Sequence, residues 1–368
     1  MMVTSDRGRI GRRILIILTG SIGDVIRALP LLGRIRQAWP EAYIGWAVEP
    51  KSESLLRGHP WLDTLIVYDR SHAPWTFVPF LRKIRSERFD LVLDLQRHLK
   101  SGLISIVSGA PERLGFAPDN SKEFNYLFAS RHISAQPNLR LKLLQYQAFA
   151  DALDLPDVPI EFGLQLQPPE DRAARALVAS AARPMLGVIL GSSWPSRIYF
   201  PECIAKVIRG LAFAVEGSPA LFPVLLGGRD EQKLAASVID HVGEVPVLDL
   251  TGRTSLRDLI GIFAECAVAF GPDSGPMHLA AAVGCPVVSL WGSTAPERSA
   301  PWSFANLTIR GEIPCHPCYL RKCPIGQECM RRIAPEAVVD MVRHALNNSA
   351  SRTTGKISTS GHDPRWAR

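Results

Sequence analysis

The stretch "CAVAFGPDSGPMHLAAAVGCPVVSLWG" (266–292) contains a complete strand–helix–strand unit. Its two apolar runs, 266–271 and 286–292, are short and nearly continuous, which is typical of strands buried on both faces of a parallel sheet. Between them, "GPDSGPMH" is followed by a helical segment that carries no charged residue after His278. We therefore expect a helix that is buried along its body and whose first turn faces a polar partner.

The same alternation of apolar runs and amphipathic stretches extends along the whole chain. The further strands that we expect are 13–19, 43–49, 64–69, 91–96, 185–191, 221–228 and 245–252, with helices at 25–39 and 77–86 in the first half. A Pro-containing stretch at 165–177 separates the two sets of strands. This pattern predicts an α/β protein with two doubly wound domains, at 1–166 and 167–347, followed by a disordered tail at 348–368 that has little apolar content.

The composition describes a globular protein with acidic partners. Of the 368 residues, 46% are hydrophobic and 21% are charged. The sequence has no apolar run long enough to span a membrane, and the first apolar run resembles a buried strand more than a signal peptide, so we expect a cytoplasmic protein. The net charge of +7 suggests acidic partners, but the chain has no basic stretch with interleaved aromatic residues, and nucleic acid is not expected.

Three polar loops follow expected strands, where ligands bind in open α/β sheets. The first, "TGSIGD" (19–24), lacks the glycine pattern of a dinucleotide site. Asp24 either caps the following helix or accepts a proton from a substrate hydroxyl.

The other two loops contain residues suited to phosphate. In "GSSWPSR" (191–197), Ser192, Ser193 and Arg197 form either a phosphate-binding site or an ordinary surface turn. In "GPDSGPMH" (271–278), Asp273 or Ser274 could act only as a helix cap, with His278 as a core residue. Alternatively, the first turn of this helix binds a phosphate through its N–H groups and dipole, while Asp273 orients donors or meets a sugar hydroxyl.

Taken together, these loops resemble glycosyltransferase family 9, the ADP-heptose:lipopolysaccharide heptosyltransferases. The stretches that carry the likeness are "GSIGDVIRALPLL" (20–32), "GSSWPSRIYFPE" (191–202) and the long segment from "LTGRTSL" to "ERSAPW" (250–302). "DLQRHLKSGLIS" (94–105) and "RLGF" (113–116) are similar to acceptor-domain stretches of that family. The likeness extends over about residues 13–345.

The resemblance implies a GT-B fold, with two facing Rossmann-like domains and an interdomain cleft. It implies an inverting transfer of heptose without a catalytic metal or other cofactor, with the acceptor bound mainly by the first domain and the nucleotide sugar by the second. Asp24 matches the family's general base. The positions that match the donor site are Ser192, Ser193, Arg197, Asp273, Ser274, Gly275 and His278. Many members have Lys where this chain has Arg197, and the geometry of the two side chains is not equivalent.

The implied acceptor is the anionic inner core of lipopolysaccharide, which suggests peripheral contact with the cytoplasmic face of the inner membrane. Arg97, Lys100 and Arg113 are acceptor-side candidates, with solvated surface charges as the alternative. The competing functions are a nucleotide-sugar epimerase on the same scaffold, a transferase of the family that uses another sugar or acceptor, and a binding module without activity. We also expect Arg197 to contact no core residue.

Four of the seven cysteines cluster in "CHPCYLRKCPIGQEC" (315–329). Cys315, Cys318, Cys323 and Cys329 resemble a closed structural zinc site, with His316 as a spare ligand. A disulfide pair and simple reduced thiols are the alternatives. Any metal here would be structural.

Overall fold

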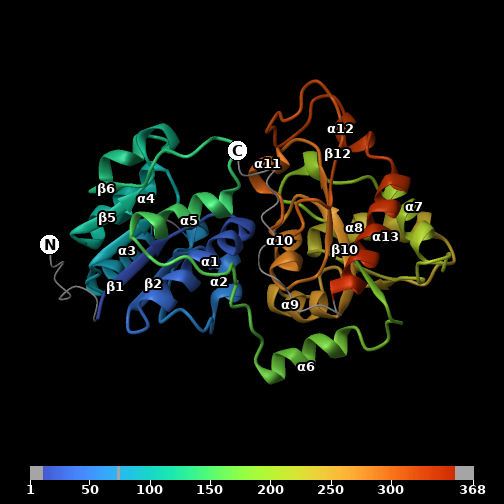
Figure 1. Cartoon of the computed structure of the whole chain (residues 1–368), viewed down its shortest axis with the longest axis horizontal. Coiled ribbons are helices and arrows are strands. Elements are labelled where there is room, and N and C mark those ends of the chain that lie inside the picture. The colour runs from blue at the N-terminus through green and yellow to red at the C-terminus, as the bar shows by residue number, and fades with distance from the viewer. Residues whose placement is uncertain (1–10, 73–74, 353–368) are drawn as a thin grey trace. The chain divides into compact units, whose positions relative to one another are not determined.

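The computed structural model describes residues 11–72 and 75–352. The chain forms two compact units, and the boundary between them along the sequence lies between Gln165 and Leu166 (Figure 1). Within the described residues, the strands form two six-stranded sheets, and every pairing between neighbouring strands is parallel. The predicted α/β architecture of two parallel sheets is confirmed. None of the helices in these residues is both long and apolar enough to cross a membrane.

The sheet of the first unit has the order β3–β2–β1–β4–β5–β6. Its strands are β1 (Arg13–Ile17), β2 (Tyr43–Val48), β3 (Thr64–Val67), β4 (Leu91–Asp94), β5 (Glu112–Gly115) and β6 (Arg131–His132). The first four match the expected strands with slightly shorter ends. Strands β5 and β6 were not predicted, because they are short and each includes charged or polar residues at the edge of the sheet.

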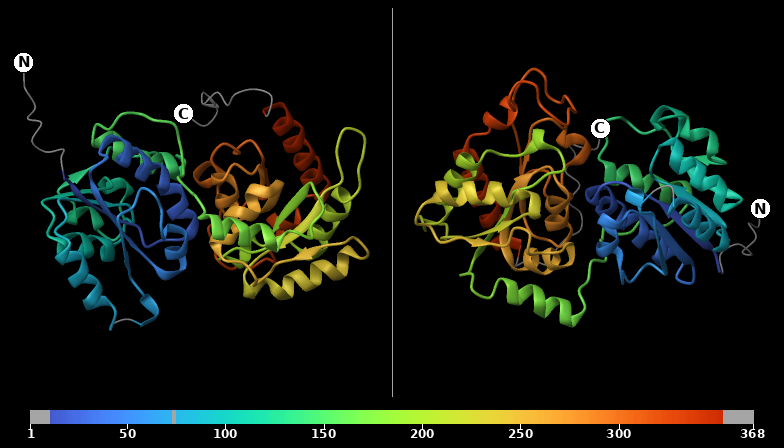
Figure 2. Two further views of the ribbon diagram at one scale, coloured as in Figure 1. Left: turned by 90° about the horizontal axis from the view of Figure 1, so that it is seen from below. Right: turned by 180° about the vertical axis from the view of Figure 1, so that it is seen from behind.

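Helices cover both faces of this sheet (Figure 2). The helices are α1 (Ile22–Ala38), α2 (Pro50–Leu56), α3 (Phe77–Ser86), α4 (Leu99–Ser108) and α5 (Lys142–Ala152), with short 3-10 turns η2 (Arg70–His72), η3 (Pro118–Asn120) and η4 (Asn125–Phe128). On one face, Ile84 of α3 and Ile104 of α4 belong to the same buried cluster as Leu15 and Val92 of the strands. Helix α1 packs with α5 instead.

The sheet of the second unit has the order β12–β11–β10–β7–β8–β9. Its strands are β7 (Met185–Ile189), β8 (Phe222–Leu226), β9 (Leu248–Asp249), β10 (Cys266–Pro272), β11 (Val287–Trp291) and β12 (Thr308–Arg310). Its larger helices are α6 (Pro168–Leu177), α7 (Pro201–Leu211), α8 (Gln232–Val242), α9 (Leu256–Glu265), α10 (Gly275–Ala282) and α13 (Pro335–Arg352), and its shorter helical turns are η5 (Pro195–Arg197), η6 (Arg229–Glu231), α11 (Pro296–Ser299) and α12 (Glu328–Arg331). The expected tail at 348–368 begins inside α13, and residues 353–368 lie outside the described part of the chain.

Each unit has a point where the strand order reverses, and the polar loops lie there. In the first unit, β1 and β4 are neighbours, and the chain continues from them into α1 and α4. In the second unit, β7 and β10 are neighbours, and α10 follows β10 and packs with α9, whereas α7 packs with α8 and α13. Loops that diverge from neighbouring parallel strands leave a crevice at their carboxyl ends. The fold therefore brings the loops at 191–197 and 271–278 together.

Candidate active site

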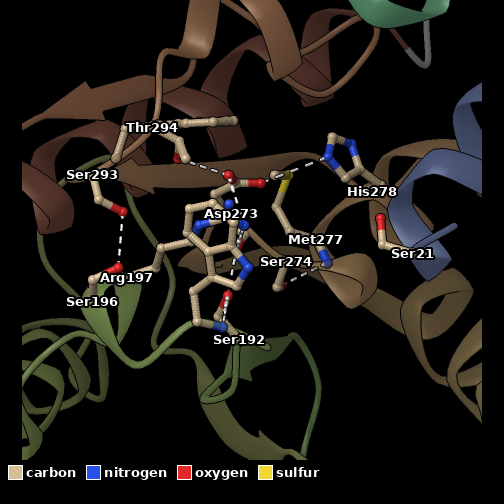
Figure 3. Close-up of polar contacts among 12 residues, drawn as sticks. Ser21, Ser192, Ser196, Arg197, Asp273, Ser274, Met277, His278, Ser293 and Thr294 are labelled. Carbon is tan, nitrogen blue, oxygen red and sulfur yellow. Dashed lines mark hydrogen bonds and ion pairs between the residues drawn. The ribbon is translucent and has the colours of Figure 1, made fainter. Parts of the chain in front are cut away.

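Asp273 is the centre of the polar site in the second unit (Figure 3). It follows the last residue of β10 and is 6% exposed. Its Oδ2 accepts a hydrogen bond of 2.8 Å from Thr294 Oγ1 and lies 3.0 Å from Nη1 of Arg197. Its Oδ1 lies 3.9 Å from Nε2 of His278, a buried side chain of α10. One carboxylate thus connects the loops that follow β7, β10 and β11.

The loop after β7 is attached to the same residue. Ser192 Oγ donates a hydrogen bond of 2.8 Å to the main-chain oxygen of Asp273, and Ser193 is exposed beside it. The guanidinium of Arg197 lies over the ring of Trp194, 4.1 Å from its centroid, and the Arg197 side chain is only 14% exposed. The expectation that Arg197 contacts no core residue is wrong, because its guanidinium is the counter-ion of buried Asp273.

Helix α10 presents its N-terminus beside this ion pair. Ser274 is the N-cap, and its side chain accepts a hydrogen bond of 3.4 Å from the main-chain N–H of Met277. Of the two capping alternatives, Ser274 rather than Asp273 therefore caps the helix. Gly275 is the first residue of α10. The N-terminus of a helix carries partial positive charge and favours an anion, so this end of the sheet combines a guanidinium with a helix dipole.

Asp24 lies in the first turn of α1, at the corresponding edge of the first unit. The N-cap of α1 is Ser21, whose Oγ accepts from the Asp24 N–H at 3.3 Å and donates to Asp24 Oδ2 at 3.0 Å. The alternative in which Asp24 itself caps the helix is therefore wrong. Asp24 Oδ1 lies 2.7 Å from Nη2 of Arg27 and 2.5 Å from Nζ of Lys142, the first residue of α5.

These neighbours set the protonation state of Asp24. Burial alone would raise the pKa of this carboxyl, but the charges and hydrogen bonds of Lys142 and Arg27 outweigh burial and hold the pKa well below its usual range. Asp24 is therefore ionised at neutral pH. The two cations engage Oδ1, whereas Oδ2 contacts the hydroxyl of Ser21.

Two of the three acceptor-side candidates follow β4, the neighbour of β1. Arg97 has a positive φ of 71° and its guanidinium lies 3.8 Å from the centroid of the Phe116 ring. Lys100 Nζ lies 3.7 Å from the centroid of the Tyr68 ring, and burial, with a smaller contribution from nearby Arg70, lowers the pKa of Lys100.

Arg113 has different surroundings. Its guanidinium donates to the main-chain oxygens of Ala110, at 2.7 Å, and Phe128, at 2.9 Å. These bonds join the segments that flank β5. The structure therefore gives Arg113 a structural role in this edge of the sheet and does not bring it together with Arg97 and Lys100.

Four polar residues of these sites were absent from the sequence prediction: Ser21, Arg27, Lys142 and Thr294. The contact of Arg27 with Asp24 could have been predicted from the sequence, because a residue three positions after Asp24 lies on the same side of a helix. Lys142 is 118 residues from Asp24 in the chain, and Thr294 is 21 residues from Asp273. Only tertiary packing reveals these two partners.

The four clustered cysteines line one small hollow together with Ser196, Ser293, Ile313, Ile325 and Glu328. All four are free thiols, so the disulfide alternative is wrong for this structure. Burial, with a smaller effect of the other three thiols, raises the pKa of Cys329. Within residues 11–72 and 75–352, no group of three or more His, Cys, Asp or Glu side chains is arranged to hold a metal ion. The expected structural zinc site is therefore not supported.

Comparison with known proteins gives one consistent family. The sequence pattern of Glycosyltransferase family 9 (heptosyltransferase) matches residues 78–328. The lipopolysaccharide core heptosyltransferase OpsX of Haemophilus influenzae is 24% identical over 293 residues, which is 78% of this chain and 81% of that protein. The lipopolysaccharide heptosyltransferase 1 of Pseudomonas aeruginosa is 26% identical over 326 residues, which is 84% of this chain and 87% of that protein.

Solved structures show the same fold. A family 9 glycosyltransferase from Veillonella parvula superposes with a TM-score of 0.77 at 20% identity and covers 92% of this chain and 98% of its own. The Escherichia coli heptosyltransferase WaaC, solved with ADP, superposes with a TM-score of 0.68 at 20% identity and covers 92% of this chain and 99% of its own. The two-domain α/β architecture is thus the GT-B fold. Because the family pattern extends over most of the chain and includes the loops around Arg197 and Asp273, this protein is a member of glycosyltransferase family 9, the heptosyltransferase family.

Proposed function

We propose that the protein is an inverting glycosyltransferase that moves heptose from ADP-heptose to the anionic inner core of lipopolysaccharide. The observation that carries this proposal is the pairing of Arg197 with the N-terminus of α10 around Asp273, at the point where the strand order of the second sheet reverses. This is where a nucleotide diphosphate binds in open α/β sheets. The relatives support the choice of sugar and acceptor, since they are named as lipopolysaccharide heptosyltransferases.

In this proposal, the second unit (167–347) holds the donor. Negative charge develops on the diphosphate as the bond to the sugar breaks, and the Arg197 guanidinium and the helix dipole of α10 stabilise it. Ser193 supplies a hydroxyl donor from the same loop, Ser192 holds this loop against the main chain of Asp273, and Gly275 leaves room for a phosphate beside the first turn. Asp273 keeps Arg197 oriented and, together with His278, is placed for contacts with the nucleotide sugar. The Arg197 guanidinium and the helix dipole of α10 supply the positive charge, and we propose that catalysis needs no cofactor.

The first unit (1–166) binds the acceptor and supplies the base. An acceptor hydroxyl attacks the anomeric carbon, its proton passes to Asp24, and ADP leaves with the electron pair of the broken bond. A single displacement of this kind inverts the configuration. Because Lys142 and Arg27 engage Oδ1, we assign the proton to Oδ2. The low pKa of Asp24 keeps it ionised, and proton transfer becomes favourable as the acceptor oxygen forms its new bond.

Arg97 and Lys100 are the cations that we assign to the anionic acceptor, since both follow β4 beside the strand that leads to Asp24. The acceptor is anchored in lipid, whereas nucleotide sugars are cytoplasmic compounds. We therefore propose that the protein works in peripheral contact with the cytoplasmic face of the inner membrane.

The test is an assay of ADP release with ADP-heptose and a panel of truncated lipopolysaccharide acceptors. We expect release that depends on the acceptor, together with a product whose mass increases by one heptose. An epimerised nucleotide sugar formed without acceptor would instead support an epimerase, and transfer only from a different nucleotide sugar would contradict the assignment of heptose.

A further inference from the structure

Helix α4 has an outer face that is apolar. Leu99, Leu103 and Ile106 are spaced four and three residues apart, so they share one side of the helix. They are 44%, 46% and 47% exposed. Lys100 is the only charged residue in this helix. A surface helix ordinarily presents polar residues on its outer face, so this face is unusual for a helix in water.

The 3-10 turn η4 extends this apolar surface. Phe124, just before the turn, and Leu127, within it, are 69% and 67% exposed. Helix α4 and η4 are in close contact, because a Cβ added at Gly102 would lie 2.5 Å from the ring of Phe128. The five exposed residues together are called the α4–η4 patch: Leu99, Leu103, Ile106, Phe124 and Leu127.

A buried carboxylate holds the two elements in place. Asp94, at the end of β4, accepts hydrogen bonds from Ser101 Oγ of α4 at 2.9 Å and from Asn125 Nδ2 of η4 at 2.8 Å. Because one buried residue connects both elements to the sheet, the patch is a defined surface and not the tip of a loose loop.

The surroundings of the patch are basic. Helix α3 lies beside α4 (Figure 1), and Arg85 Nη1 donates to the main-chain oxygen of Ser108 at 3.3 Å, which joins the carboxyl ends of the two helices. The exposed side of α3 carries Arg82 and Lys83, and exposed Lys122 precedes η4. Of the nearby acids, Glu87 forms ion pairs with Lys83 and Arg13, and Glu123 Oε1 lies 3.1 Å from Nδ1 of His98.

We propose that the α4–η4 patch docks on the surface of an anionic lipid bilayer. Apolar side chains surrounded by Lys and Arg suit the boundary between lipid headgroups and acyl chains of an anionic membrane. A second copy of the chain fits less well. A symmetric contact would place the basic residues around one patch against the same basic residues of the other copy, and like charges repel. The inference rests on the proposed function in one respect. Lys100, in the first turn of α4, is one of the cations that we assign to the acceptor, and that acceptor is anchored in lipid.

The test is cosedimentation of the full chain with vesicles of phosphatidylethanolamine and phosphatidylglycerol, compared with phosphatidylcholine vesicles. We expect binding to the anionic vesicles that weakens with salt. The double variant Leu103→Asp/Leu127→Asp should lose at least about fivefold of this binding, because it removes two apolar side chains and adds two carboxylates that the anionic surface repels. Phe213→Asp is the matched control, because Phe213 is 67% exposed in the second unit and lies outside the patch.

The readouts separate this inference from the proposed function. Turnover of a delipidated, soluble acceptor should be the same in the wild type and in both variants, whereas turnover of acceptor embedded in vesicles should fall only in the double variant. Equal vesicle binding by the wild type and the double variant overturns the docking surface while leaving the transferase intact. A dimer that the double variant dissociates would assign the patch to a second copy. If the double variant lost vesicle binding and neither the wild type nor the variants transferred heptose, the result would support the docking surface and contradict the proposed transferase function.

Discussion

Asp24 in the first unit and Asp273 in the second are each held by cations, but their surroundings suit different roles. Asp273 is buried and pairs with Arg197, which orients a donor for phosphate. Asp24 Oδ1 is paired with Arg27 and Lys142, and its Oδ2 accepts a hydrogen bond from the hydroxyl of Ser21. In the role that we propose for Asp24, its Oδ2 accepts a proton from a substrate hydroxyl, whereas Asp273, whose Oδ2 contacts both Arg197 and Thr294, mainly positions the guanidinium.

The proposed role of Asp24 as a base predicts the effect of Asp24→Asn on turnover. The change removes the proton acceptor and keeps the shape of the side chain, so kcat should fall by roughly 10²–10⁴-fold. The Kd for ADP, measured by calorimetry, should change little because we place the donor in the second unit. A near-normal kcat would mean that Asp24 only supports the first turn of α1.

The ion pair between Lys142 and Asp24 predicts a change in pH dependence for Lys142→Met. Removing this cation should raise the pKa of Asp24, so that more of the carboxylate is protonated at acidic pH. The acidic limb of kcat/KM should therefore move upward by about 1–3 pH units, the usual effect of one nearby opposite charge.

Lys142→Arg keeps the charge and serves as the control for this experiment. Its acidic limb should stay near that of the wild type. If Lys142→Met gave an unchanged pH profile with normal activity, Lys142 would not set the protonation of a carboxylate on which turnover depends.

We propose two roles for Arg197, and Arg197→Ala should reveal both. ADP binding should weaken by about 1.5–3 kcal/mol, the usual value of a hydrogen bond to a charged group. The free energy of unfolding should also fall, by about 3–5 kcal/mol, because Asp273 would be left as a buried charge without this partner. Calorimetry with ADP and denaturant unfolding measure the two effects. Unchanged ADP affinity would place the diphosphate elsewhere.

At the scale of elements, the site depends on how closely β10 passes β7. Gly271 allows this approach, because a Cβ added there would lie 2.5 Å from the main-chain oxygen of Ile189. The neighbouring ends of the two strands lead directly into the loops with Arg197 and Asp273. The helix caps contribute as well, since Ser21 and Ser274 fix where α1 and α10 begin.

We expect Gly271→Ala to disturb both stability and donor binding. The added methyl group meets main-chain atoms, so β10 must shift, at a cost of about 1–3 kcal/mol in the free energy of unfolding. The shift would also move Asp273 away from Ser192 and weaken ADP binding. Thermal unfolding and ADP titration test this expectation, and a variant with wild-type values in both would show that the strands separate without affecting the site.

At the scale of the whole molecule, the two sheets have the same topology, but different polar residues follow the carboxyl ends of their strands. The edge of the second unit combines Arg197 with the N-terminus of α10, and the edge of the first unit combines Asp24 with Lys142, Arg97 and Lys100. The basic balance of the chain, +7 overall, agrees with two anionic substrates.

The charge that these residues supply predicts that turnover does not require a divalent metal. Treatment with EDTA followed by gel filtration should leave kcat and the KM for donor near their original values. Loss of activity that Mg²⁺ or Mn²⁺ restores would contradict this prediction and assign the neutralisation of the diphosphate to a metal ion. Metal analysis of the same preparation also tests the cysteine cluster, because zinc well below one equivalent agrees with the absence of a metal-ligating arrangement in the described residues.

The sequence by itself determined the alternation of strands and helices and the polar loops at the strand ends. Buried parallel strands need continuous apolar runs, and turns favour Gly, Pro and Ser. Both features depend on neighbouring residues in the chain, so the sequence predicts them. The exceptions were β5, β6 and β12, which are short edge or near-edge strands with few apolar residues. The cysteine spacing suggested zinc, but spacing along the chain does not dictate where the thiol atoms point.

Only the tertiary structure decided which groups neutralise each other. Lys142 reaches Asp24 because α5 packs on α1, and Thr294 reaches Asp273 because β11 pairs with β10. The burial of Arg197 beside Asp273 likewise follows from the neighbouring positions of β7 and β10. The physical reason is that an ion pair depends on distance in space and on burial, and packing between distant segments sets both.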